Sequence, residues 1–251
     1  MLERLQRTPI GAQDRVTGRP NLPDLFILAH DADPAVPERG HMEIRSNGLR
    51  DALSSVQASR PQNEAQLSGW DCEHNMLAPY LHFYHIRGLL RGQRALVPEE
   101  QQRHLDLLLQ YLDSQFGSVY DEADGLFEEG YVTKDHVHKL FGPDEVLVTV
   151  ENGHPIGMVA KHCPLPNSHP IKLDCEGWAF NGRFAKSTKR VTLQWPHGDS
   201  LPDKIPISLL AWYPLRLDRT GMDARLRRRG EIFWSCRKRR FVRYNASGTD
   251  V

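Results

Sequence analysis

The chain has 251 residues, with 32 basic and 32 acidic side chains that give a formal net charge of zero. This length suits one domain with a short appendage, and no run of residues approaches the ~18 apolar positions of a membrane span. The four cysteines follow no disulfide-like spacing and the N-terminus lacks the apolar region of a secretory signal. We therefore expect an intracellular protein, cytoplasmic or nuclear, that does not interact with a membrane.

Residues 1–69 are rich in Pro, Gly, Asp, Arg, Gln and Ser, and their one apolar cluster is Leu25–Ala29. A segment this polar buries too little apolar surface to offset the conformational entropy that is lost when the chain becomes ordered. We therefore expect residues 1–69 to be disordered, with a short linear binding motif around Leu22–Ala29 as the alternative.

The residues that follow are expected to be mainly helical. Leu77–Arg87 contains three aromatic side chains and is interpreted as an irregular or strand-like piece. A helix is predicted from Pro98 to Gly117, because Pro98 suits a first helical turn and Gly117 can end the helix. Its apolar residues recur at helical spacing and form one stripe, made of Leu105, Leu108, Leu109, Leu112 and Phe116.

Two shorter helices are predicted after this one. The first covers residues 119–129 and ends at Gly130, and Thr133 can cap the second, which Gly142-Pro143 breaks. The side chains of the second short helix that are predicted to face the core are Val137, Leu140 and Phe141.

Asp144–Leu215 contains two Asn-Gly pairs, Asn152-Gly153 and Asn181-Gly182, each flanked by β-branched and aromatic runs. Both central residues of a type I′ turn need positive φ, which Asn tolerates and Gly adopts freely, so each pair is predicted to form a two-residue hairpin tip. Two hairpins and the run Ile205–Tyr213 give about five strands, enough for a small closed or nearly closed antiparallel barrel.

Aromatic side chains gather near the second Asn-Gly pair. Trp178 and Phe180 share one strand face, because side chains alternate along a strand, while Ile171–Cys175 presents an apolar series on the other face. If the apolar face is interior, the aromatic residues are expected to pack under the helix around Leu105–Phe116, whose stripe needs a partner surface; the alternative is an exposed recognition surface. The candidate partner-binding residues are Trp178, Phe180, Phe184 and Trp195.

The C-terminal part is strongly basic. Residues 216–243 contain eleven basic and three acidic side chains, a local excess of eight positive charges. Within Gly221–Tyr244, residues 222–241 are predicted to form a helix, and Gly230 within it suggests close packing. The side chains expected to face inward are Leu226, Ile232, Phe233 and Cys236. The basic residues form either a solvated face or a patch for nuclear import or nucleic-acid binding; its candidates are Arg227, Arg228, Arg229, Arg237, Lys238, Arg239 and Arg240.

These elements predict an α+β fold in a single domain over residues 77–244. It consists of a helical segment, then a small antiparallel β-barrel-like sheet of about five strands, and a basic C-terminal helix.

Two local strings look like catalytic or metal sites. Asp121–Asp124 spells the acidic box of helicases, but it falls in a helical pattern and no phosphate loop accompanies it. Four residues of zinc-ligand type lie close together without zinc-site spacing, and a core cysteine with loop histidines explains them better; they are His162, Cys163, His169 and Cys175. We therefore expect no catalytic residue, no metal and no cofactor.

Several strings stand in a specific order and spacing: Leu140–Val146, Cys175–Phe184, Val191–Pro196, Ile205–Leu210, Tyr213–Arg216 and Leu226–Trp234. Together they resemble a fungal domain of unknown function that precedes the AAA+ ATPase core in a group of large filamentous-fungal proteins. The resemblance runs from Tyr80 to about Tyr244. That family has no established activity, so it implies no catalytic residues, and because the Walker motifs of longer relatives lie downstream, ATP binding is not expected of this chain alone.

Two functions of different classes follow. The first is a non-catalytic recognition or adaptor domain that recruits a protein partner through the sheet or through a cleft between sheet and helices. The second is a nucleic-acid-binding module that uses the basic C-terminal helix and its aromatic residues. A third possibility is that the chain is a truncated fragment of a longer AAA+ ATPase.

Overall fold

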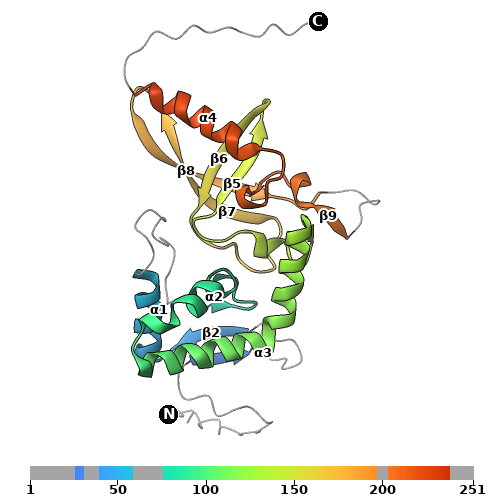
Figure 1. Ribbon diagram of the computed structural model, residues 1–251. Helices are drawn as coiled ribbons and strands as arrows, with labels where there is room; N and C mark the ends of the chain where they lie inside the picture. Colours follow the sequence, from blue (N-terminus) through green and yellow to red (C-terminus); the bar gives the residue numbers. More distant parts are fainter. Residues whose placement is uncertain (1–25, 31–39, 59–75, 197–202, 238–251) are drawn as a thin grey trace, which may run out of the picture.

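The computed structural model of the protein describes residues 26–30, 40–58, 76–196 and 203–237. Figure 1 shows a helical part at one end and a five-stranded antiparallel sheet, crossed by a single helix, at the other. The predicted α+β fold, with a sheet of five strands and a C-terminal helix, is confirmed.

The helical part contains, within the described ranges, three α-helices and a three-stranded antiparallel sheet of order β1-β2-β3. Its elements are β1 (Phe26–His30), β2 (Gly40–Ile44), α1 (Asn47–Ala58), β3 (Met76–Leu77), α2 (Leu81–Gln93) and α3 (Glu99–Glu129).

The first three elements lie in the region that was expected to be disordered, so the structure differs from that expectation over residues 26–30 and 40–58. The apolar residues there are few but well spaced. Met42 and Ile44 alternate on β2 and are buried. In α1 the buried side chains recur at i, i+3, i+4 and i+7, namely Leu49, Ala52, Leu53 and Val56. The rest of residues 1–69 lies outside the described ranges.

The helix α2 replaces the irregular or strand-like piece predicted over residues 77–87, and that prediction was wrong. Its buried side chains follow helical spacing and are Leu81, Phe83, Tyr84, Ile86 and Leu90. The aromatic residues that suggested a strand instead fill the space between helices, since the rings of Tyr84 and Tyr120 lie 5.1 Å apart across α2 and α3.

The helix α3 is continuous where two helices were predicted. It passes through Gly117 and ends at Gly130, whose φ of 86° suits a helix C-terminus. The predicted stripe is buried and continues into the second half; its members are Leu105, Leu108, Leu109, Leu112, Phe116, Tyr120, Ala123 and Phe127. This burial offsets the cost of about 1 kcal/mol for a glycine inside a helix. Figure 1 shows that α3 bends near its middle. The helix contains Gly117-Ser118, a pair typical of helix bends.

The five strands follow the order β10-β5-β6-β7-β8, with β10 and β8 at the edges, so the sheet is open where a closed or nearly closed barrel was considered. Its strands are β5 (Val146–Glu151), β6 (His154–Ala160), β7 (Ile171–Phe180), β8 (Phe184–Leu193) and β10 (Tyr213–Pro214). A separate pair, β4 (Tyr131–Thr133) and β9 (Lys204–Pro206), links the end of α3 to the sheet.

The hairpin turns agree with prediction in part. Asn152 and Gly153 have φ of 51° and 74° and form the predicted two-residue tip. The second hairpin differs, because Phe180 pairs directly with Phe184 and leaves a three-residue loop. The apolar face of Ile171–Cys175 is buried in the core, as predicted.

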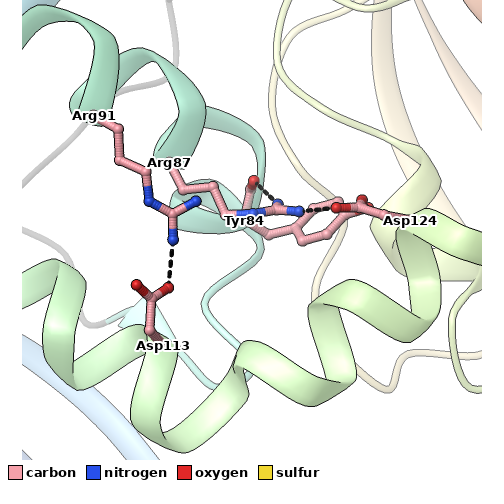
Figure 2. A network of polar contacts seen from close by, with 5 residues as sticks. All are labelled: Tyr84, Arg87, Arg91, Asp113 and Asp124. Carbon is pink, nitrogen blue, oxygen red and sulfur yellow. Dashed lines mark hydrogen bonds and ion pairs between the residues drawn. The ribbon is translucent and has the colours of Figure 1, made fainter.

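Polar contacts fix α2 against α3 (Figure 2). The Arg87 guanidinium and the Tyr84 hydroxyl both donate to the carboxylate of Asp124, the hydroxyl at 2.5 Å. Arg87 also lies over the Tyr84 ring, 4.2 Å from its centre. Arg91 and Asp113 form a second, exposed ion pair at 2.5 Å, which is worth about 1 kcal/mol or less. The acidic string therefore lies on a helix, as predicted, and one of its carboxylates ties two helices together.

Beside this network the helices meet the sheet. Gly142 packs on the ring of His85, where a Cβ atom would lie only 2.8 Å from Nδ1. Burial lowers the pKa of His85 to about 3, and the positive charges of Arg216 and Arg87 and the neighbouring His82 add to this effect. His85 is therefore neutral in the folded protein at neutral pH.

We expect this histidine to make folding sensitive to acid. Its pKa is near 6.5 in the unfolded chain, so the unfolded state binds the proton more readily than the folded state between about pH 6.5 and 3. The free energy of unfolding should be highest above pH 6.5 and fall by up to about 1.4 kcal/mol per pH unit as the pH drops through this window. Urea unfolding at a series of pH values measures the slope.

The variant His85→Gln should show a shallower slope than the parent chain over this window. His154→Gln, at an exposed strand position, is the matched control. Equal slopes for the parent and His85→Gln would contradict a neutral His85 whose Nε2 atom is buried.

Candidate functional site

The candidate site lies beneath α4 (Met222–Ser235), which crosses the five-stranded sheet (Figure 1). Trp234 of α4 contacts Trp178, which is on the sheet face opposite to the buried Ile171–Cys175 face. The first turn of the helix is held by Asp218, whose carboxylate accepts from the backbone N–H of Met222 at 2.7 Å. The helix therefore covers the second face of the sheet, and the core covers the first.

The first half of α4 is close to β6. Leu226 packs on Gly157, where a Cβ atom would lie 3.5 Å from both Leu226 methyl groups. Arg229 donates to the carbonyl of Pro155 at 2.6 Å, so the helix is also hydrogen-bonded to the strand. A side chain larger than hydrogen at Gly157 would fill the remaining space between helix and strand.

The other end of α4 rests on an aromatic cluster at the tip of the β7–β8 hairpin. The ring of Phe184 lies 4.8 Å from Phe180, 4.9 Å from Phe233 and 5.2 Å from Trp234. Trp178 lies 6.4 Å from Trp234. We call these five residues the aromatic cluster; they join a strand hairpin to a helix that lies about 50 positions later in the chain.

This arrangement corrects one prediction and places the candidate partner-binding residues. Trp178 and Phe180 do not pack under α3: Trp178 contacts Trp234 of α4, Phe180 contacts Phe184 of β8, and the two remain 57% and 47% exposed. The stripe of α3 packs within the helical part instead. Phe184 is half-buried in the aromatic cluster. Trp195 is separate from it and packs half-buried against the core.

Between the two ends of α4 the helix and the sheet leave a groove of about 930 Å³. Gly157 and Val159 of β6 line the sheet side, and Trp178 stands at the end near the aromatic cluster. On the helix side Gly230 faces open space, since nothing lies within 4 Å of the position of its absent Cβ atom. The close packing predicted for Gly230 was therefore wrong. Its lack of a side chain widens the groove.

The face that α4 turns to the sheet is also narrower than predicted. Leu226, Phe233 and Cys236 were predicted to face inward, and they are half-buried. Ile232 is 58% exposed, so its predicted inward position was wrong. In α4 one residue, Met222, is buried and a few are half-buried. Because so little of the helix is buried against the sheet, a groove remains between them.

Charged side chains surround the groove. The carboxylate of Glu176 pairs with Lys186 at 2.5 Å and with Lys161 at 3.4 Å, and these hydrogen bonds lower its pKa. Asp223 pairs with Arg227 at 2.8 Å. Asp144 and Arg229 complete the charged lining. The groove is thus apolar in the middle and charged at its rim.

The basic patch is only partly a single surface. Arg227 and Arg229 line the groove, whereas Arg228 does not. Arg237 lies over the Trp234 ring at 5.3 Å. The other candidates, Lys238, Arg239 and Arg240, lie outside the described residues.

A buried polar cluster was missed by the sequence reasoning. Lys139 is 3% exposed, and its ammonium lies 2.9 Å from Nδ1 of His136. Nε2 of His136 faces the carboxylate of Glu122 at 3.5 Å, and burial lowers the pKa of His136, followed in effect by Lys139. The lysine lies among apolar residues that were correctly predicted to be buried, Val137, Leu140 and Phe141. The predicted short helix is only a 3₁₀ turn (Val137–Leu140), which ends before Phe141. A lysine inside that apolar string was the available signal.

The residues of zinc-ligand type do not come together. Among the described residues, no group of three or more His, Cys, Asp or Glu side chains could hold a metal ion. Burial raises the pKa of Cys163 to about 12 and that of Cys175 to about 11, so both thiols stay protonated and unreactive. His162 instead pairs with Asp174 at 3.5 Å, and His169 lies beside His138.

Residues 122–219 match a family described as "Domain of unknown function (DUF7025)", so the chain contains such a domain. The match covers the last turns of α3 from Glu122 onward, the five-stranded sheet and Lys139 with its neighbour His136, and it ends before α4. No curated protein and no solved structure matches the chain. None of the described helices is long and apolar enough to cross a membrane.

The open space at Gly230 leads to a stability prediction. Gly230→Ala should raise the free energy of unfolding by about 1 kcal/mol, because alanine favours the helix and its methyl group meets no neighbour. Thermal unfolding followed by circular dichroism measures the effect. Gly221→Ala is the contrasting variant and should lower stability, since φ at Gly221 is 79°. A loss of stability in Gly230→Ala would show that α4 packs closely there.

Proposed function

We propose that the protein is a non-catalytic recognition domain that binds a segment of a partner protein in the groove between α4 and the sheet. The observation that carries this proposal is a preformed groove of about 930 Å³ that has the exposed Trp178 in its lining, with a second exposed tryptophan, Trp234, in contact with Trp178. Pockets of this size are typical of binding sites, and exposed Trp side chains commonly anchor protein interfaces. Trp178 and Trp234, 57% and 48% exposed, are the expected anchors.

The proposal extends to the setting of the domain. The resemblance of the quoted strings to the domain that precedes fungal AAA+ ATPase cores supports an adaptor role beside such an ATPase. The domain of unknown function in residues 122–219 is consistent with this, although its description names no activity. Recognition by the groove would need no nucleotide on this chain.

A nucleic-acid-binding function is the second candidate, because basic and aromatic side chains alternate at the hairpin tip. Lys186 is the cross-strand neighbour of Trp178, and Arg237 lies over Trp234. Lys186 already pairs with Glu176 and Arg227 with Asp223, so these two cations are less available for phosphate groups. Protein recognition therefore has the better support.

To test the proposal, a library of random displayed peptides is selected for binding to the purified protein. The affinity of the selected peptides is then measured for the parent and for a variant in which a large side chain fills the groove. In Gly230→Trp the indole should occupy the groove, because the space beside Gly230 is open. Gly125→Trp is the matched control at another exposed helical glycine with nothing within 4 Å. We expect selected peptides to bind the parent and Gly125→Trp equally and to lose at least about tenfold in affinity for Gly230→Trp.

Two results would overturn the proposal. One is a selection that enriches no peptide, or peptides that bind Gly230→Trp as well as the parent. The other is tight binding of mixed RNA or single-stranded DNA whose affinity falls steeply with salt, which is the signature of phosphate contacts and would favour the second candidate.

A further inference from the structure

We infer that the segment bound in the groove is acidic and carries one large apolar side chain, which rests against Gly230. This inference deepens the proposed function and depends on it. It commits to the chemistry of the partner segment, which the shape of the groove alone does not define.

The side chains that line the groove carry a net positive charge. Four cationic side chains line it, against three carboxylates; the cations are Lys161, Lys186, Arg227 and Arg229, and the carboxylates are Asp144, Glu176 and Asp223. Both lysines share the single carboxylate of Glu176, so one positive charge of that trio is uncompensated. A basic partner segment would meet this excess with like charge, whereas an acidic one is attracted to it.

The helix α4 carries further positive charge near the groove. Beyond the groove-lining arginines it carries Arg225 and Arg228, against the one further carboxylate of Glu231. Arg225 donates to the carbonyl of Gly153 at 3.4 Å, which leaves its charge uncompensated. Among the described residues, Arg228 has no ion pair, and Arg237 just after the helix contacts a ring. The helix therefore carries a net positive charge, with four arginines against two carboxylates, although Arg225 and Arg228 lie outside the groove lining.

We expect Arg229 to bind a carboxylate of the acidic partner segment. Its one hydrogen-bond acceptor in the described part of the chain is the neutral carbonyl of Pro155, so most of its donors are available. A guanidinium at the rim of an apolar groove binds a carboxylate with two parallel hydrogen bonds, which fixes its position as well as its charge.

The groove also has an apolar side at the middle of α4. Leu226 and Phe233 stand on either side of Gly230 on the groove face of α4, and Trp178 faces them from β7. A large side chain entering here contacts apolar surface on three sides and reaches the helix backbone at Gly230, where no Cβ atom blocks it. An aromatic or long aliphatic residue fills this space; a charged one would lose its hydration.

The same site fits a nucleic acid less well. A polyphosphate carries a charge on every nucleotide, and its phosphates would lie near the carboxylates of Glu176 and Asp223 at the groove rim. A peptide can space its Asp and Glu residues so that they meet Arg229 and Lys161 and avoid those carboxylates. The mixed rim therefore favours an acidic peptide.

Three synthetic peptides test the inference by fluorescence anisotropy on the full chain. The first has Asp and Glu residues flanking a central Trp, the second has Ala in place of the Trp, and the third has Lys residues in place of the acidic ones. We expect the first to bind at least about tenfold more tightly than the other two. In Arg229→Glu the order of the acidic and the Lys peptide should reverse, whereas Arg228→Glu, outside the groove lining, should keep the parent's order.

Equal affinity for the acidic and Lys peptides, binding that does not depend on the central Trp, or no binding of any of the three would overturn the inference. The proposed function fails separately. If display-selected peptides bind the groove but are not acidic, the recognition function stands and only the chemistry assigned to its partner is wrong. If no peptide of any composition depends on Gly230, both are wrong.

Discussion

The structure depends most on the continuous buried stripe of α3. Its first half packs in the helical part, and its second half runs to Phe127 and ends where β4 begins, so one continuous helix connects the two parts. The end of the helix is fixed from the sheet side, because Arg219 donates to the carbonyl of Glu129 at 3.3 Å. The Arg87–Asp124 pair and the contact of Gly142 with His85 then hold α2 and the sheet against it (Figure 2). These contacts present the far face of the sheet to α4.

The groove arises from the way α4 is held at its two ends. Leu226 approaches β6 closely because Gly157 has no side chain, and the aromatic cluster supports the other end on the hairpin tip. Bulky rings at one end and a glycine at the other leave the middle of the helix apart from the strands. Gly230 widens this middle part further, at a cost in helix propensity of about 1 kcal/mol. A residue that lowers stability and opens a surface is typical of a binding site.

Features with a local cause could be predicted from the sequence. The α3 stripe follows from helical spacing, the tip at Asn152-Gly153 from its need for positive φ, and the buried face of Ile171–Cys175 from strand alternation. The α2 helix could not be predicted, because its aromatic residues are compatible with either a strand or a helix. The contact between Tyr84 and Tyr120 of α3, which shows that these rings pack between two helices, is a tertiary feature.

The candidate site was predictable only in its residues. Strand alternation placed Trp178 and Phe180 on one face of the sheet, but it could not decide which helix covers that face. The helix that contacts Trp178 is α4, whereas α3 was predicted. Whether Gly230 marks close packing or an opening depends on the tertiary distance between helix and sheet. The burial of Lys139 depends on how its turn packs in the fold, where His136, its contact, faces Glu122 of α3.

The central claim is that the groove between α4 and the sheet is the binding surface of the protein. Amide hydrogen exchange, with and without the tightest peptide from the display selection, tests it most directly. The account predicts slower exchange in β6, in β7 and in α4, with the helical part unchanged. Slower exchange confined to the free edge of β8 or to the helical part, or no change in any segment, would contradict it.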